Sequence, residues 1–169
     1  ARDWIVVNIN YRLSHEAKAP AAVADCLKAL DWVFENAEKY QIDNDRIVVS
    51  GDSAGGHLAL LTGMPMEGVS LCGGKYVVAK TNRVAAIINW FGSTDFSLQD
   101  PYQRSVYKTP HDWFDPNDDY EELIHSLSPV NYVRSGGVPV LTIHGTIDPA
   151  VPFNQAELLH KKLRNAGVM

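Results

Sequence analysis

The segment SGDSAGGHLA, residues 50–59, places small residues on both sides of one serine. Glycine adopts backbone angles that strain other residues, and its missing Cβ lets another part of the backbone come close. The segment therefore predicts a tight turn. Within it, Gly51, Ser53 and Gly55 match G-x-S-x-G, a pattern in which a serine at a strained strand-to-helix turn exposes its Oγ beside an oxyanion donor.

The residues that flank this turn decide between two interpretations of it. At ordinary glycine and serine usage, the bare pattern occurs by chance in roughly one chain in twenty of this length. Residues 46–50, however, have the pattern of a short buried strand, and residues 54–64 form an apolar run suited to a buried helix. Strand, motif and helix arrive in the required order, which favours a nucleophile at Ser53 over a glycine-rich packing turn with an incidental serine.

Composition bounds the class of protein. The chain has 169 residues, of which 46% are hydrophobic and 21% charged, so we expect one globular domain. A net charge of −5 argues against a nucleic-acid partner, and no apolar run is long enough to predict a membrane span. Cys26 and Cys72 form no C-x-x-C, so they indicate neither a zinc site nor a disulfide framework.

Strand and helix patterns alternate along the chain. This alternation predicts an α/β fold with a mostly parallel sheet and helices on both faces, in a single domain over residues 1–169. A stretch at about residues 92–137 is too long for a plain connection and predicts a cap-like insertion of short helices. The remaining predicted strands cover residues 5–11, 84–91 and 138–143, and the remaining predicted helices cover residues 23–37 and 153–166.

A serine nucleophile needs a base and a carboxylate, which in this architecture follow in the order Ser, acid, His. HGTIDPAVP, residues 144–152, offers Asp148 in a shaped loop directly after a predicted strand. Asp95 is the rival, but its position also suits a residue that caps a turn. We therefore favour Asp148 as the acid.

No histidine of the chain fits the role of the base. His160 alone follows Asp148, and it stands in a predicted helix beside two lysines, as on a solvated face. His144 ends a strand and His57 points into the fold, so local packing or hydrogen bonding explains both better than catalysis. The other histidines precede the acid or lie in the insertion: His15, His111 and His125.

Two long stretches resemble one family. NINYRLSHEAKAPAAVADCLKALDWVFENAEKYQIDNDRIVVSGDSAGGHLAL, residues 8–60, and PVLTIHGTIDPAVPF, residues 139–153, resemble the α/β-hydrolase esterases of the hormone-sensitive-lipase-like group, including feruloyl and acetyl esterase relatives. The resemblance implies Ser53 as nucleophile, Asp148 as triad acid and the Ala54 N–H as one oxyanion donor. It also implies a structural role for Tyr11, Arg12 and Asp25, and acyl-pocket walls formed by Trp90, Phe91 and Trp113.

The chain departs from this family in two places. An H-G-G oxyanion loop before the first strand and a catalytic histidine beyond the acid loop are both absent from its 169 residues. We therefore expect an internal segment of a longer protein, inactive by itself, whose triad histidine lies outside it. The family's sheet order also implies a gap between strand 5–11 and the Ser53 strand, through which copies of the chain could associate as a homo-oligomer.

These observations predict a serine carboxylic ester hydrolase that acts on short-chain or aromatic acyl esters. Its partner is a small-molecule ester, and neither a metal nor an organic cofactor is expected. Two alternatives stay open. One is a non-catalytic hydrolase-like module that binds a small ligand, and the other is an amide or peptide hydrolase, which would use the same groups.

Overall fold

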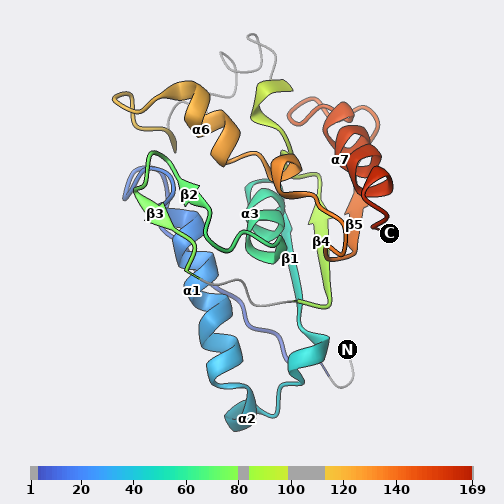
Figure 1. The fold of residues 1–169 in the computed structure, drawn as a ribbon. Helices are drawn as coiled ribbons and strands as arrows, with labels where there is room; N and C mark the ends of the chain where they lie inside the picture. The colour runs from blue at the N-terminus through green and yellow to red at the C-terminus, as the bar shows by residue number, and fades with distance from the viewer. Residues whose placement is uncertain (1–3, 80–83, 99–112, 169) are drawn as a thin grey trace.

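The computed structural model describes residues 4–79, 84–98 and 113–168, and Figure 1 shows how they are arranged. The helices and strands in chain order are α1 (Ala21–Glu35), α2 (Ala37–Tyr40), η1 (Asn44–Arg46), β1 (Val48–Asp52), α3 (Ala54–Gly63), β2 (Ser70–Leu71), β3 (Tyr76–Val77), β4 (Ala86–Trp90), η2 (Phe96–Leu98), α6 (Tyr120–Ser126), η3 (Pro129–Tyr132), β5 (Val140–Ile143) and α7 (Asn154–Asn165).

A parallel sheet in the order β1-β4-β5 forms the centre of the fold. Asp52 lies beside Trp90 in the register, and Trp90 lies beside Ile143, so the three strands end together. Their carboxyl ends therefore share one edge of the sheet. In open α/β sheets this edge is where ligands bind.

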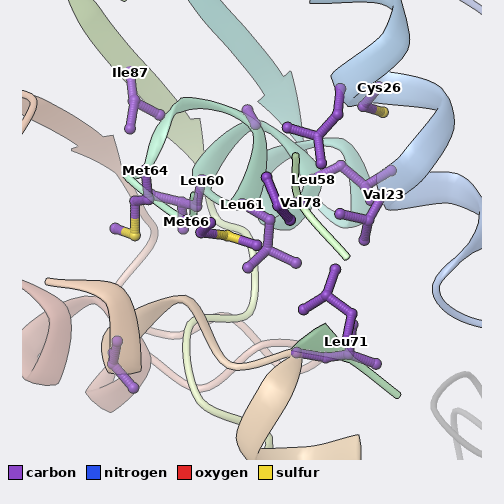
Figure 2. Packing of buried hydrophobic residues seen from close by; sticks show 14 of the residues in the cluster. Val23, Cys26, Leu58, Leu60, Leu61, Met64, Met66, Leu71, Val78 and Ile87 are labelled. Atoms are coloured by element: carbon purple, nitrogen blue, oxygen red, sulfur yellow. The ribbon is translucent and has the colours of Figure 1, made fainter. Parts of the chain in front are cut away.

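Helix α3 covers one face of the sheet and is buried on all sides over most of its length. Residues 56–63 are all buried, because α3 lies between the sheet and α1. Gly63 comes so close to Val49 and Ile87 that a Cβ there would overlap their side chains. Figure 2 shows Val23 and Cys26 of α1 beside Leu58 of α3, in the main hydrophobic cluster.

The opposite face of the sheet carries exposed apolar side chains. Trp90, Leu141 and Ile143 are 41%, 55% and 39% exposed, whereas their strand neighbours Asn89 and Val140 are buried, Asn89 against Gly56 of α3. This alternation is the period of two expected of a strand with unlike faces. The α/β class and the parallel sheet are confirmed, and α3 is the helix that contacts the sheet most in the described residues.

The structure corrects two local predictions. Residues 4–11 form no strand, because no described strand lies beside them to pair with their backbone, and most of their apolar side chains are exposed. The sequence predicts no strand between α3 and β4, yet β2 and β3 pair there as a short antiparallel hairpin. Cys72, Gly73 and Gly74 adopt positive φ at its turn.

The predicted insertion at residues 92–137 does contain short helices. Segments η2, α6 and η3 lie in it, while residues 99–112 fall outside the described part. Figure 1 shows α6 beyond the carboxyl ends of β1 and β4. Its function as a cap stays a prediction.

A buried amide joins the insertion to the last helix. Gln155 of α7 is fully buried, and its Oε1 accepts hydrogen bonds from the Thr94 N–H at 2.8 Å and the Asp95 N–H at 2.7 Å. Its Nε2 donates to the Asp95 carbonyl at 2.7 Å. One side chain therefore satisfies three backbone groups that would otherwise be buried without partners.

We predict that Gln155→Ala lowers the free energy of unfolding by on the order of 3 to 5 kcal/mol, because each backbone group left unpaired costs about 1–3 kcal/mol. Urea unfolding followed by circular dichroism measures the change. Asn154→Ala, at the exposed neighbouring position, is the matched control and should change it by less than about 0.5 kcal/mol. A loss below about 1 kcal/mol for Gln155→Ala would contradict the assignment.

Candidate active site

Ser53 occupies a sharp corner between β1 and α3. Its backbone lies at φ 50° and ψ −116°, a combination that costs a non-glycine residue on the order of 1–3 kcal/mol. Two neighbours hold it there: its N–H donates to the Trp90 carbonyl at 2.8 Å, and its carbonyl accepts from the His57 N–H at 3.1 Å. Ser53 itself is exposed. The expected strained strand-to-helix turn with an exposed serine is thus present.

The glycines around Ser53 are required by close packing. A Cβ on Gly51 would overlap the Gly55 carbonyl, because the end of β1 and the start of α3 touch backbone to backbone. A Cβ on Gly56 would collide with Asn89 and with the Trp90 carbonyl of the neighbouring strand. The small residues therefore allow the corner to seat directly against β4.

The start of α3 supplies amide donors beside the serine. Ala54 is the first residue of the helix, and the first amides of a helix have no partner within it. The Ser53 side chain makes no capping hydrogen bond to them. The positive end of the helix dipole adds to their attraction for a negatively charged oxygen.

Asp148 stands in the loop that follows β5, at the same edge of the sheet as Ser53. Its Oδ1 accepts hydrogen bonds from the Ala150 N–H at 2.8 Å and the Val151 N–H at 2.9 Å. Its Oδ2 lies 3.7 Å from Nε2 of His144. One carboxylate oxygen is thus committed to its own loop.

The rival acid, Asp95, is engaged in a turn. Its Oδ1 accepts from the Ser97 N–H at 2.8 Å and the Ser97 hydroxyl at 2.6 Å, at the start of η2. Its own backbone is held by Gln155. These contacts are those of a turn cap.

No described histidine is hydrogen-bonded to Ser53 through its ring. His57 is buried, with Nδ1 at 3.0 Å from the Ser93 carbonyl, and burial lowers its pKa to about 4. His144 is buried beside the acid loop. His160 lies on α7, where burial and then Arg164 lower its pKa. His15 is exposed and His125 lies in the last turn of α6, while His111 falls outside the described residues.

A cavity of about 740 Å³ opens between residues 4–11 and β1 and extends to Ser53 and Ala54. Helices α1 and α3 form its floor. Within the described part of the chain, no backbone hydrogen bond crosses from residues 4–11 to β1. One flank of β1 is therefore without a neighbouring strand here.

The three predicted acyl-pocket walls lie in two places, and none of them lines this cavity. Trp90 ends β4, and Phe91 follows it with φ 43°, an uncommon angle for a bulky residue. The Phe91 N–H donates to the Ile143 carbonyl at 2.9 Å. Trp113 instead packs on buried rings, 5.7 Å from His57 and 6.3 Å from Phe96 between ring centroids.

A bidentate ion pair attaches residues 4–12 to α1. Arg12 Nε and Nη2 donate to Asp25 at 2.8 and 2.7 Å, and the Arg12 N–H donates to the same carboxylate at 3.0 Å. These hydrogen bonds to Arg12 lower the pKa of Asp25. Tyr11 packs partly against the core cluster. The three residues thus make structural contacts.

The two cysteine thiols are poor candidates for a nucleophile in place of Ser53. Cys26 and Cys72 are free and buried, and burial raises their pKa values to about 11 and about 12, so both thiols stay protonated.

The described residues contain no group of three side chains able to hold a metal ion. Nor does any helix among them combine the length and apolar character that crossing a membrane requires.

Sequence reasoning missed Asn89 and Gln155, two buried amides. Asn89 Oδ1 accepts from the Gly92 N–H at 2.9 Å and so shapes the turn next to Ser53. A signal for Gln155 exists, because it stands four and eight residues before Leu159 and Leu163 on the buried stripe of α7. No comparable signal marks Asn89, whose strand reads as simply apolar.

Comparison with known proteins places these features in a family. The BD-FAE family model matches residues 1–163. The esterase LipQ of Mycobacterium tuberculosis is 33% identical over 168 residues, which cover 97% of this chain and 39% of the relative. The probable carboxylic ester hydrolase LipM of the same organism is 32% identical over 173 residues, with 97% and 38% covered. The chain thus spans about two fifths of these relatives' length.

Solved structures agree with the fold. A truncated form of a carbohydrate esterase from gut microbiota matches with a TM-score of 0.77 and 31% identity, over 95% of this chain and 61% of that one. An acetyl ester-xyloside bifunctional hydrolase from Caldicellulosiruptor lactoaceticus matches with a TM-score of 0.73 and 28% identity, over 94% and 56%.

We predict that the free energy of unfolding decreases as the pH falls because of His57. Its pKa is about 4 when folded and about 6.5 when unfolded, so its contribution is complete above pH 6.5 and is lost as the pH falls toward 4. The loss over that window is on the order of 3 kcal/mol. Urea unfolding at pH 7, 6 and 5 should show a much shallower decline for His57→Gln than for the wild type. His15→Gln, at an exposed site, should leave the decline unchanged, and equal slopes for all three proteins would refute the prediction.

Proposed function

The chain belongs to the BD-FAE family, and we propose that it carries the nucleophile and the acid of a serine carboxylic ester hydrolase. One observation supports this above all: Ser53 is held at positive φ where a strand meets a helix, exposed at the carboxyl edge of a parallel sheet. Such strain at an exposed hydroxyl is typical of functional sites. The relatives and structural neighbours described above are named as esterases and ester hydrolases.

The proposed chemistry is acyl transfer. Ser53 Oγ attacks the ester carbonyl while a histidine takes its proton, and the alcohol leaves with that proton. Water then hydrolyses the acyl-serine by the same route. The Ala54 N–H donates to the oxyanion, and the donor gains strength from its place at the start of α3.

Asp148 holds the histidine in this scheme. Its Oδ1 is occupied by two loop amides, which leaves Oδ2 for an imidazole N–H. The histidine and a second oxyanion donor come from outside these 169 residues. The free flank of β1 at the 740 Å³ cavity leaves room for a donor strand next to Ser53.

The first test is hydrolysis of p-nitrophenyl acetate. The chain alone should show little activity, and the chain extended at both ends by its flanking sequence should be active. In the extended protein, Ser53→Ala should lower kcat by on the order of 10⁶ and Asp148→Asn by on the order of 10⁴.

Asp95→Asn is the matched control for the acid, because this carboxylate only caps a turn; kcat should stay within about threefold. Robust, Ser53-dependent turnover by the short chain would show that it holds its own base. Binding of an ester without turnover by the extended protein would indicate a ligand-binding module. Preferred cleavage of an anilide would indicate an amide hydrolase.

The second test concerns the acyl group. We propose short-chain or aromatic acyl esters as substrates, with Trp90, Phe91 and Trp113 as walls. Acetate and cinnamate esters should therefore be turned over faster than palmitate. Trp90→Ala should raise KM for the cinnamate ester about tenfold, through lost aromatic contact. Trp32→Ala, at a similarly exposed tryptophan of α1, should not change it. Equal or faster turnover of palmitate would overturn the assignment.

A further inference from the structure

We propose that His144 is a positioning residue for the acid, because its ring cross-links the loop that carries Asp148. His144 follows β5 directly, and its side chain is only 1% exposed. Its Nε2 lies 2.8 Å from the Val151 carbonyl. A carbonyl can only accept a hydrogen bond, so Nε2 carries the proton and is committed to this contact.

Val151 connects the imidazole to the carboxylate. Its carbonyl accepts from His144, while its N–H donates to Asp148 Oδ1 at 2.9 Å. The ring of Phe153 meets the imidazole edge to face, with 5.8 Å between centroids, and fixes its plane. The loop is therefore closed by a side chain buried beneath it.

The same contact orients the free carboxylate oxygen. Oδ1 of Asp148 is satisfied by two amides, and Oδ2 lies 3.7 Å from the protonated Nε2 of His144. The dipole of that N–H attracts Oδ2 and opposes rotation of the carboxylate. An acid that must align another imidazole depends on this orientation, and a misplacement of about 1 Å can cost on the order of 100-fold in rate.

One test rests on the proposed function and uses the extended protein. His144→Phe keeps a ring against Phe153 but removes the donor. We expect it to lower kcat about 10- to 100-fold with KM within twofold. His144→Gln, which keeps an N–H donor, should recover kcat to within about threefold of the wild type.

A double-mutant cycle with Asp148→Asn separates positioning from general stability. If His144 acts through Asp148, His144→Phe changes kcat less than twofold in the Asp148→Asn background. An equal loss in both backgrounds would reduce His144 to a purely structural role and overturn the proposal. Should His144→Phe fail to fold, His144→Asn, whose shorter amide cannot span to Val151, takes its place in the cycle.

A second measurement needs no activity and uses the 169-residue chain. Amide hydrogen exchange at Ala150 and Val151 should become about tenfold faster in His144→Phe, because their acceptor is no longer fixed. Exchange unchanged at both amides would overturn the proposal whatever the enzyme assay shows. Failure of the proposed function would be recognised separately, because hydrolysis by the extended protein would then survive Ser53→Ala.

Discussion

Direct contact between backbones at the corner of residues 51–56 is the constraint on which the rest of the structure depends. The end of β1 meets the start of α3 without room for a Cβ, and the first turn of α3 meets β4 in the same way. This contact places α3 flat against the sheet, and α3 in turn forms the layer on which α1 packs. Ser53 is exposed because the neighbouring residues of this corner, Gly51, Ala54, Gly55 and Gly56, are small.

The parts of the fold that follow from local pattern could be predicted from the sequence. The α3 helix, the stripe of α1 and the strands β4 and β5 carry strong periodicity or long apolar runs, and only their ends shifted by one or two residues, as usual where helices and strands fray. The Ser53 corner was predictable because its geometry demands a particular set of small residues. The place of Asp148 in a loop after β5 was predictable from the strand pattern before it, while its role as the acid stays a prediction.

What could not be predicted depends on contacts between distant segments. Residues 5–11 have a strand pattern, but a strand needs a neighbour, and none lies beside them in the described chain. The ring cluster of His57, Phe96 and Trp113 joins three separate segments of the chain, and no local pattern marks it. Gln155 and Asn89 are polar residues in apolar patterns, and their importance appears only when their backbone partners are known.

Trp90 presents two chemically separate groups, its main-chain carbonyl and its indole. Its main-chain carbonyl accepts the N–H of Ser53, whereas its side chain projects, 41% exposed, from the opposite face of the sheet. Every residue type has a main-chain carbonyl, so the hydrogen bond to Ser53 does not depend on the indole. Evolution can therefore exchange the side chain at residue 90 without loss of the hydrogen bond that holds Ser53 at its strained angles, so this face of the sheet can change independently of the corner.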